Sequence, residues 1–141
     1  ENLGFAGGNN FGIKYALENG ADFVFTLNND TVLDKDLLIQ LIKVANSSEG
    51  GAIFGPKIYF APGYEYHKKR YRPKDSGKVI WYAGGIIDWQ NVLASHRGVD
   101  EVDEGQYESP VATDFASGCA MLIKRETLEK VGLFDNRYFI S

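Results

Sequence analysis

Asp22–Asp30, with the sequence Asp-Phe-Val-Phe-Thr-Leu-Asn-Asn-Asp, is the stretch that decides the fold. It begins as an apolar run and then breaks into three polar residues, the last of which is a carboxylate. A run without polar/apolar alternation is typical of a strand covered on both faces, as in a mostly parallel sheet. Ligands of such sheets bind beyond the carboxyl ends of the strands, so we expect Asn28, Asn29 and Asp30 to lie at a site.

The segment before this strand predicts a helix. Leu3–Gly12 is rich in glycine, and Asn9 or Asn10 can cap a helix that ends at Gly20. We expect its apolar faces to come from Phe11, Ile13, Tyr15 and Leu17.

The segments after the strand continue an α/β pattern. Asp34 is suited to cap a second helix, and Ala52–Phe60 predicts a second strand that is interrupted at Gly55-Pro56. Further along, the sequence predicts two short strands joined as a hairpin, a later strand and a short helix that ends at Gly132: Val79–Ala83, Ile86–Trp89, Cys119–Lys124 and Arg125–Val131. Helices that alternate with strands favour one α/β domain over residues 1–141.

The composition excludes several classes of protein. The chain has 141 residues, of which 44% are hydrophobic, and its 13% aromatic content argues against intrinsic disorder. A net charge of -4 disfavours binding to nucleic acid through general phosphate neutralisation. The one cysteine, Cys119, fits a reducing compartment, and no apolar run approaches the roughly 18 residues that span a bilayer. We therefore expect a cytoplasmic protein.

Two charged blocks of opposite sign stand out in the second half of the chain. Tyr64–Lys78 carries six Lys and Arg residues against two acidic ones, whereas Gly98–Glu108 carries five acidic residues and no basic one. We expect the basic loop to be mobile. We also expect it to contact either an anionic acceptor molecule or, peripherally, the surface of a membrane.

Asn28, Asn29 and Asp30 form the first candidate site. One carboxylate at a strand end can hold Mg²⁺ or Mn²⁺ when phosphate oxygens and waters complete the coordination shell, because hard cations prefer oxygen. Such an ion would neutralise a diphosphate leaving group. The alternative is a turn in which these side chains bond local backbone amides.

Glycines near the start of the chain form the second candidate site. Gly4, Gly7, Gly8 and Gly12 permit close approach of a phosphate or ribose to the backbone. The spacing matches neither the G-x-G-x-x-G dinucleotide fingerprint nor a phosphate loop that ends in Gly-Lys-Ser/Thr. A tight connection without a ligand is the alternative.

Two further groups are candidates for binding a sugar or an acceptor. Trp81 and Trp89 lie near Gly84-Gly85 and His96, and aromatic faces beside glycines can stack on sugar rings. The alternatives are core tryptophans and a histidine that is merely solvated. The second group, Thr113–Cys119, could form the base of a pocket that binds an acceptor molecule. The thiol of Cys119 has no neighbouring base in the sequence, so we expect it to be a buried apolar group.

Taken in order along the chain, these segments resemble family 2 of the nucleotide-sugar glycosyltransferases, especially its rhamnosyltransferase-like branch. The matching pieces are Asn2–Asn10, Leu27–Thr31, Gly55–Tyr59, Trp81 with Gly84-Gly85, Ser117–Ile123, Val131–Asp135 and Tyr138-Phe139.

The resemblance implies a GT-A fold, a Rossmann-like α/β/α sandwich with a mostly parallel mixed sheet, which would be incomplete at both ends in this chain. It implies inverting transfer of a sugar from a nucleotide-diphospho-sugar to a saccharide or lipid-linked acceptor. It also implies a role in polysaccharide or glycoconjugate synthesis at the inner face of the membrane. Asp30 falls on the family's Asp-x-Asp position and becomes the metal ligand. The nucleotide-sugar side, about residues 1–60, would include Asn2, Gly4, Asn9, Asn10, Asn28 and Asn29, and the acceptor side, about residues 79–141, would include Trp81, Gly84, Gly85, Ser117 and Gly118.

The resemblance also implies that two parts of the family's site lie outside this chain. An early aspartate for the nucleoside would precede Asn2, and the general base on the acceptor hydroxyl would lie beyond Ser141. We therefore expect the 141-residue piece alone to be inactive. Two alternative functions remain. One is a nucleotidyltransferase on a similar scaffold, which would require a basic glycine-rich loop, although Asn2–Asn10 contains no Lys or Arg. The other is a non-catalytic module that binds a nucleotide or sugar.

Overall fold

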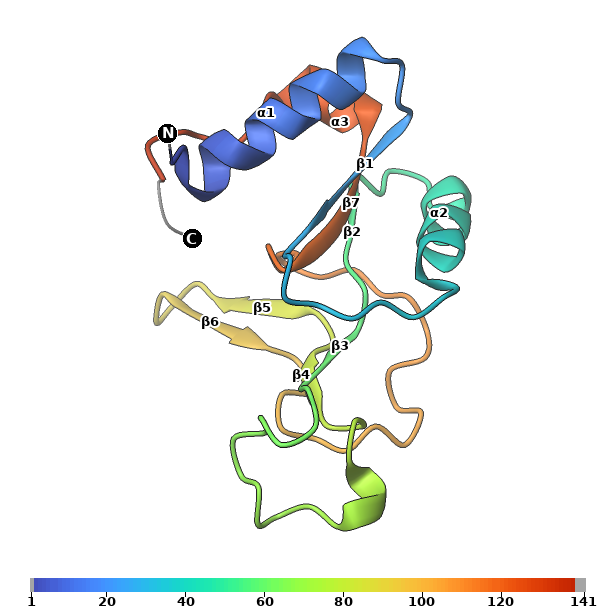
Figure 1. Cartoon of the computed structure of the whole chain (residues 1–141), viewed down its shortest axis with the longest axis vertical. Helices are drawn as coiled ribbons and strands as arrows, with labels where there is room; N and C mark the ends of the chain where they lie inside the picture. Colours follow the sequence, from blue (N-terminus) through green and yellow to red (C-terminus); the bar gives the residue numbers. More distant parts are fainter. Residues whose placement is uncertain (1, 139–141) are drawn as a thin grey trace. The chain divides into compact units, whose positions relative to one another are not determined.

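The computed structural model describes residues 2–138, and these residues form two compact units (Figure 1). Unit 1 combines Glu1–Phe54 with Gly118–Ser141, and unit 2 is Gly55–Ser117. Phe139 and Ser141, which enter the sequence predictions above, lie outside the described residues. The segment predicted as the acceptor side, about residues 79–141, is thus divided between the two units.

Unit 1 is a small α/β unit built from segments at both ends of the chain. Its elements are α1 (Gly4–Glu18), β1 (Phe23–Leu27), α2 (Leu37–Ser47), β2 (Ile53–Phe54), β7 (Ala120–Lys124) and α3 (Arg125–Val131). The predicted mixture of helices and strands is confirmed. Among the described residues, no helix combines the length and apolar character needed to cross a membrane.

The sheet of unit 1 differs from the mostly parallel sheet that the sequence predicts. Its order is β1-β7-β2, and β7 runs antiparallel to both neighbours. In β1, Val24 pairs with Ile123 and Leu27 with Ala120. The apolar composition of β1 indicated burial on both faces but could not reveal the direction of a partner about 100 residues away.

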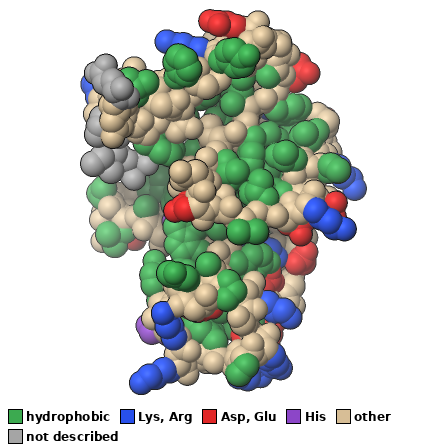
Figure 2. Space-filling model, in the orientation of Figure 1, with side chains coloured by type: hydrophobic (Ala, Val, Ile, Leu, Met, Phe, Trp, Pro, Cys, Tyr) green, Lys and Arg blue, Asp and Glu red, His purple; other side chains and the backbone are tan. Residues whose placement is uncertain are grey.

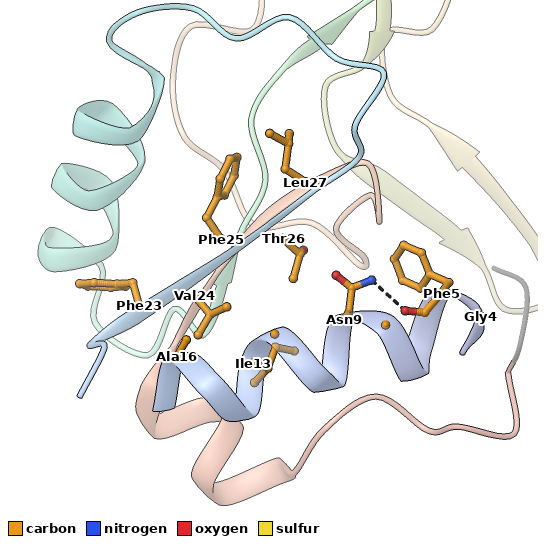
Figure 3. A pocket seen from close by; sticks show the side chains of 12 residues that line it. Gly4, Phe5, Asn9, Ile13, Ala16, Phe23, Val24, Phe25, Thr26 and Leu27 are labelled. Carbon is orange, nitrogen blue, oxygen red and sulfur yellow. Dashed lines mark hydrogen bonds between the residues drawn. The ribbon is translucent and has the colours of Figure 1, made fainter. Parts of the chain in front are cut away.

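The two faces of β1 contact different helices. Val24 and Thr26 are buried and point toward α1, whereas Phe25 lies on the opposite side of the strand (Figure 3). On that opposite side, Phe23 and Phe25 pack against a buried cluster of Leu41 and Ala45 from α2 and Leu122 from β7. Burial of each large side chain contributes about 1.5–3 kcal/mol, so this packing explains why an unbroken apolar run is needed here.

Helix α1 begins earlier than the sequence predicts. It starts at Gly4, so Asn9 and Asn10 lie inside the helix and cap nothing at its start. At the start of this glycine-rich turn, Asn2 Oδ1 accepts a hydrogen bond from Gly4 N at 2.9 Å, and further along the helix Ala6, Asn10 and Ile13 are buried. The predicted end at Gly20, with φ of +80°, is confirmed.

The predicted apolar face of α1 is only partly correct. Ile13 is buried and Leu17 is half-buried, but Phe11 and Tyr15 are 74% and 67% exposed. A helix of this length turns one face to the sheet and another outward, and the two aromatic side chains lie one turn apart on the outward face.

The other two helices of unit 1 follow the sequence more closely. Helix α2 begins after Asp36 and not after Asp34, which lies two residues earlier and whose Oδ1 accepts a hydrogen bond from Asp36 N at 2.9 Å. Helix α3 has the predicted bounds and ends at Gly132, whose φ of +95° is accessible to glycine.

Unit 2 consists of two-stranded sheets and long connections. Its elements are β3 (Ile58–Tyr59), the 3₁₀ helix η1 (Pro73–Asp75), β4 (Ile80–Tyr82), β5 (Gly85–Asp88) and β6 (Leu93–His96). The predicted strand across 52–60 is divided at Gly55-Pro56, because β2 joins unit 1 and β3 pairs with β4.

The predicted hairpin through Gly84-Gly85 is wrong. Strand β4 pairs with β3, and β5 pairs with the following strand β6. Gly85 already belongs to β5, where a Cβ atom would lie 2.3 Å from Phe115 Cδ1. The glycine is therefore needed for close packing and not for a two-residue turn.

Candidate functional site

The polar tip of β1 is exposed and its backbone is fixed. Asn28, Asn29 and Asp30 follow Leu27 directly, and all three are exposed. Asn28 N donates to Cys119 O at 2.9 Å, and Thr31 Oγ1 donates to Asn28 O at 2.9 Å. These bonds use the backbone of Asn28 and leave its side chain exposed. The tip therefore presents one carboxylate and two amides to a ligand.

Cys119 lies beside this tip, and its surroundings disfavour a reactive thiol. It is half-buried, and burial together with the negative charge of Asp30 raises the pKa of the Cys119 thiol. A raised pKa disfavours the thiolate, which is the nucleophilic form. The prediction that Cys119 is not a nucleophile therefore agrees with its surroundings, although the side chain is less buried than expected.

A groove of about 600 Å³ runs between α1 and β1 (Figure 3). Gly4, Gly8 and Gly12 from α1 line it opposite the five residues of β1, which is an edge strand of the described sheet. A Cβ atom at Gly8 or Gly12 would meet no atom within 4 Å, so these glycines leave open space along the helix. Asn9 lines the same groove, and its Nδ2 donates to Phe5 O at 2.9 Å.

The remaining residues of the predicted nucleotide side have different surroundings. Asn2 is exposed and bonds the first turn of α1. Asn10 is 5% exposed and bonds the backbone of Phe134. Sequence reasoning placed Asn9 and Asn10 together, but the helix separates them, since one lines the groove and the other lies in the interior of unit 1.

The residues predicted for the acceptor side fall mainly in unit 2. Trp81 is half-buried, and its ring centroid lies 4.5 Å from that of His96, whose Nδ1 bonds Trp81 O at 3.0 Å. Gly84 has φ of +124°, and a Cβ atom there would lie 3.2 Å from Thr113 Oγ1. His96 is thus half-buried in an aromatic cluster and not merely solvated, which was the alternative interpretation. Trp89 is 76% exposed and not a core residue.

Ser117 and Gly118 stand on either side of the boundary between the units. Ser117 is buried at the end of unit 2, and Gly118 begins the second segment of unit 1. A Cβ atom at Gly118 would lie 3.1 Å from Phe5 Cζ, so the Phe5 side chain of α1 packs directly on the backbone of Gly118.

The sequence did not reveal the cluster around Asp100 in unit 2. Asp100 Oδ2 lies 2.6 Å from His67 Nδ1 and accepts a hydrogen bond from Arg70 Nη1 at 2.9 Å, while Tyr71 donates to Oδ1. Burial tends to raise the pKa of Asp100, but its partners outweigh this and lower the pKa.

This cluster joins the two charged blocks that the sequence showed. Lys and Arg side chains gather over the Tyr64–Lys78 loop of unit 2 (Figure 2), and part of that charge is paired with Asp100. The opposite charges of the two blocks were the signal for this pairing. Less of the basic charge is therefore available to an anionic acceptor or membrane than the sequence suggests.

The tip of β1 fits a metal only if the ligand supplies most of the coordination shell. Within residues 2–138, no group of three or more His, Cys, Asp or Glu side chains is arranged to hold an ion. Asp30 and the oxygens of Asn28 and Asn29 are oxygen donors of the kind that Mg²⁺ prefers, and Mg²⁺ usually keeps waters and substrate phosphates as its other ligands. The donor set therefore suits an ion that arrives with a diphosphate.

Comparison with known proteins bears on the functional classes that the sequence left open. The family model described as glycosyl transferase family 2 matches residues 1–132. The chain belongs to glycosyl transferase family 2. Membership in this family disfavours both the nucleotidyltransferase and the non-catalytic module as interpretations of the Asp30 tip.

One curated relative is named as a hexosyltransferase. The chain is 24% identical over 140 residues to a protein of Haloferax volcanii named low-salt glycan biosynthesis hexosyltransferase Agl10. The alignment covers 99% of this chain and 40% of the relative, so the chain spans about two fifths of that protein's length. No solved structure matches the chain.

Proposed function

We propose that the protein containing this chain is an inverting glycosyltransferase that moves a sugar from a nucleotide-diphospho-sugar to an acceptor hydroxyl. The observation that carries the proposal is the family match over residues 1–132, together with an exposed carboxylate at the end of β1. Members of this family generally use nucleotide-sugar donors, and a leaving diphosphate requires charge stabilisation.

In this proposal, Asp30 is the principal ligand of a Mg²⁺ or Mn²⁺ ion, and Asn28 and Asn29 provide amide oxygens beside it. The ion supplies neutralisation of the negative charge that develops on the departing nucleoside diphosphate. The backbone bond from Asn28 N to Cys119 O holds the start of the tip against β7, two residues before Asp30.

The other half of the proposed reaction is attack by the acceptor. An alcohol is a poor nucleophile until its proton is removed as it attacks the anomeric carbon, so the reaction needs a general base. We place that base beyond Ser141, and we do not assign it to Asp114, whose Oδ2 accepts a hydrogen bond from Ile87 N at 2.9 Å within unit 2. Trp81 with Gly84-Gly85 is the proposed contact for the sugar or acceptor.

The proposal extends to the biological setting. We propose that the acceptor is a saccharide or a lipid-linked saccharide, that the enzyme belongs to the rhamnosyltransferase-like branch, and that it works in the cytoplasm at the inner face of the membrane. The name of the Haloferax relative refers to glycan biosynthesis and to hexosyl transfer, which supports a role in building a glycan.

The test uses full-length protein, a panel of nucleotide-sugars and a panel of saccharide acceptors. We expect nucleoside diphosphate to be released with one donor when a suitable acceptor is added. Release of pyrophosphate would indicate attack at the α-phosphorus and a nucleotidyltransferase. Binding of a donor without release of any product over time would indicate a non-catalytic module.

A further inference from the structure

Asn10 forms the long-range connection within unit 1 that the sequence did not predict. Its side chain is buried in α1, and Nδ2 donates to Phe134 O and to Asn136 Oδ1, both at 2.8 Å. Its Oδ1 accepts a hydrogen bond from Phe134 N at 2.9 Å. One side chain thus joins the first helix to a segment more than 120 residues away.

The orientation of the Asn10 amide follows from its partners. A backbone N–H such as that of Phe134 can only donate, so the atom that faces it must be Oδ1. Both N–H groups of Nδ2 are then used by Phe134 O and Asn136 Oδ1. A buried side chain whose two donors are already engaged is poorly suited to bind a nucleotide.

The anchored segment is connected with the polar tip of β1 through Phe5. The rings of Phe5 and Phe134 lie 6.0 Å apart, and Phe5 also packs against the backbone of Gly118, next to Cys119. The carbonyl of Cys119 accepts the hydrogen bond from Asn28 N. Gly4 and Phe5 lie at the end of α1 that is near the carboxyl end of β1 (Figure 3).

We propose that Asn10 is a positioning residue for sugar transfer, which anchors residues 134–136 to α1 beside the strand end that carries Asp30. This inference rests on the proposed function. It replaces direct nucleotide contact by Asn10 with an internal connection, and it makes the anchored residues 134–136 a part of the site's geometry. Displacement of a reacting group by about 1 Å through a distant change can cost about 10²-fold in rate.

Hydrogen exchange tests the anchor without any activity measurement. In full-length Asn10→Ala, the amide of Phe134 should lose its acceptor and exchange on the order of tenfold faster, while amides within β7 keep their protection. Asn19→Ala is the matched control, because Asn19 Nδ2 donates only one turn back, to Tyr15 O. Unchanged exchange at Phe134 would overturn the proposal.

Kinetics test the effect of the anchor on the reaction. We expect Asn10→Ala to lower kcat by about 10- to 100-fold with little change in the donor KM, and Asn136→Ala, which removes one of the three bonds, to act in the same direction but less. Asn19→Ala should match the wild type.

A raised donor KM with unchanged kcat would show that Asn10 contacts the nucleotide, and no effect on either constant would also refute positioning. If the wild type releases no nucleoside diphosphate from any donor, the proposed function fails, and the exchange result then decides on the anchor alone.

Discussion

The ion pair between Lys57 and Asp103 gives a prediction whose magnitude follows from the structure of unit 2. Lys57 Nζ lies 2.5 Å from Asp103 Oδ2, and the two side chains are 19% and 9% exposed. Burial alone would raise the pKa of Asp103, but hydrogen bonds from Lys57 and Tyr59 outweigh it and lower the pKa to about 2. The ionised form of Asp103 is therefore stabilised by folding.

The change to make is Asp103→Asn, which keeps the size of the side chain and removes its charge. The difference between an ordinary pKa of 3.8 and about 2 corresponds to about 2 kcal/mol of stability at neutral pH. Because the folded-state pKa is the lower one, this contribution is fully present above about pH 5 and is lost as the pH falls through 3.8 toward 2. Asp103→Asn should thus cost about 2 kcal/mol at pH 7 and almost nothing near pH 2.

Urea unfolding followed by tryptophan fluorescence is the assay, because both tryptophans of the chain, Trp81 and Trp89, lie in unit 2. Glu104→Gln, which removes an exposed charge from the same segment, is the control and should change the midpoint little at either pH. A loss for Asp103→Asn that is equal at pH 7 and pH 2 would refute the electrostatic reasoning.

Two further predictions concern a pair of hydrogen bonds in unit 1 and the packing of glycines. Arg125 donates to two backbone carbonyls near the end of α1, at 2.8 Å each. Arg125→Ala should therefore destabilise unit 1 by about 2–4 kcal/mol, as measured by thermal unfolding followed by circular dichroism. A change in stability below about 0.5 kcal/mol would contradict this role. Gly85→Ala would place a Cβ 2.3 Å from Phe115 and should disrupt unit 2, whereas Gly12→Ala meets no atom within 4 Å and should be neutral or stabilise α1 by up to about 1 kcal/mol. Equal expression and equal melting temperatures of the two glycine variants would refute the packing account.

Local features of the fold could be predicted from the sequence. The strand at Phe23–Leu27 was evident from its apolar run, and helix α3 with its end at Gly132 was evident from the helical pattern followed by glycine. These features depend on neighbouring residues, so composition and spacing suffice to indicate them. The exposed tip at Asp30 follows from the end of the strand for the same reason.

Features that depend on distant partners could not be predicted. Strand β7 lies between β1 and β2 because Val24 pairs with Ile123, a contact that no local pattern indicates. Gly85 looked like a turn residue because its contact with Phe115 lies 30 positions away. The start of α1 was misplaced because glycines count against a helix, although tertiary packing routinely overrides such propensities.

The central claim is that Asp30 holds the metal and diphosphate of a sugar donor. The most direct measurement is the affinity of full-length protein for its nucleotide-sugar with and without Mn²⁺, in the wild type, in Asp30→Ala and in Asp34→Asn as a nearby control. We expect Mn²⁺ to tighten donor binding in the wild type and the control, and to have no effect in Asp30→Ala, which should also lose release of nucleoside diphosphate. Donor affinity in Asp30→Ala that responds to Mn²⁺ as the wild type does would contradict the claim.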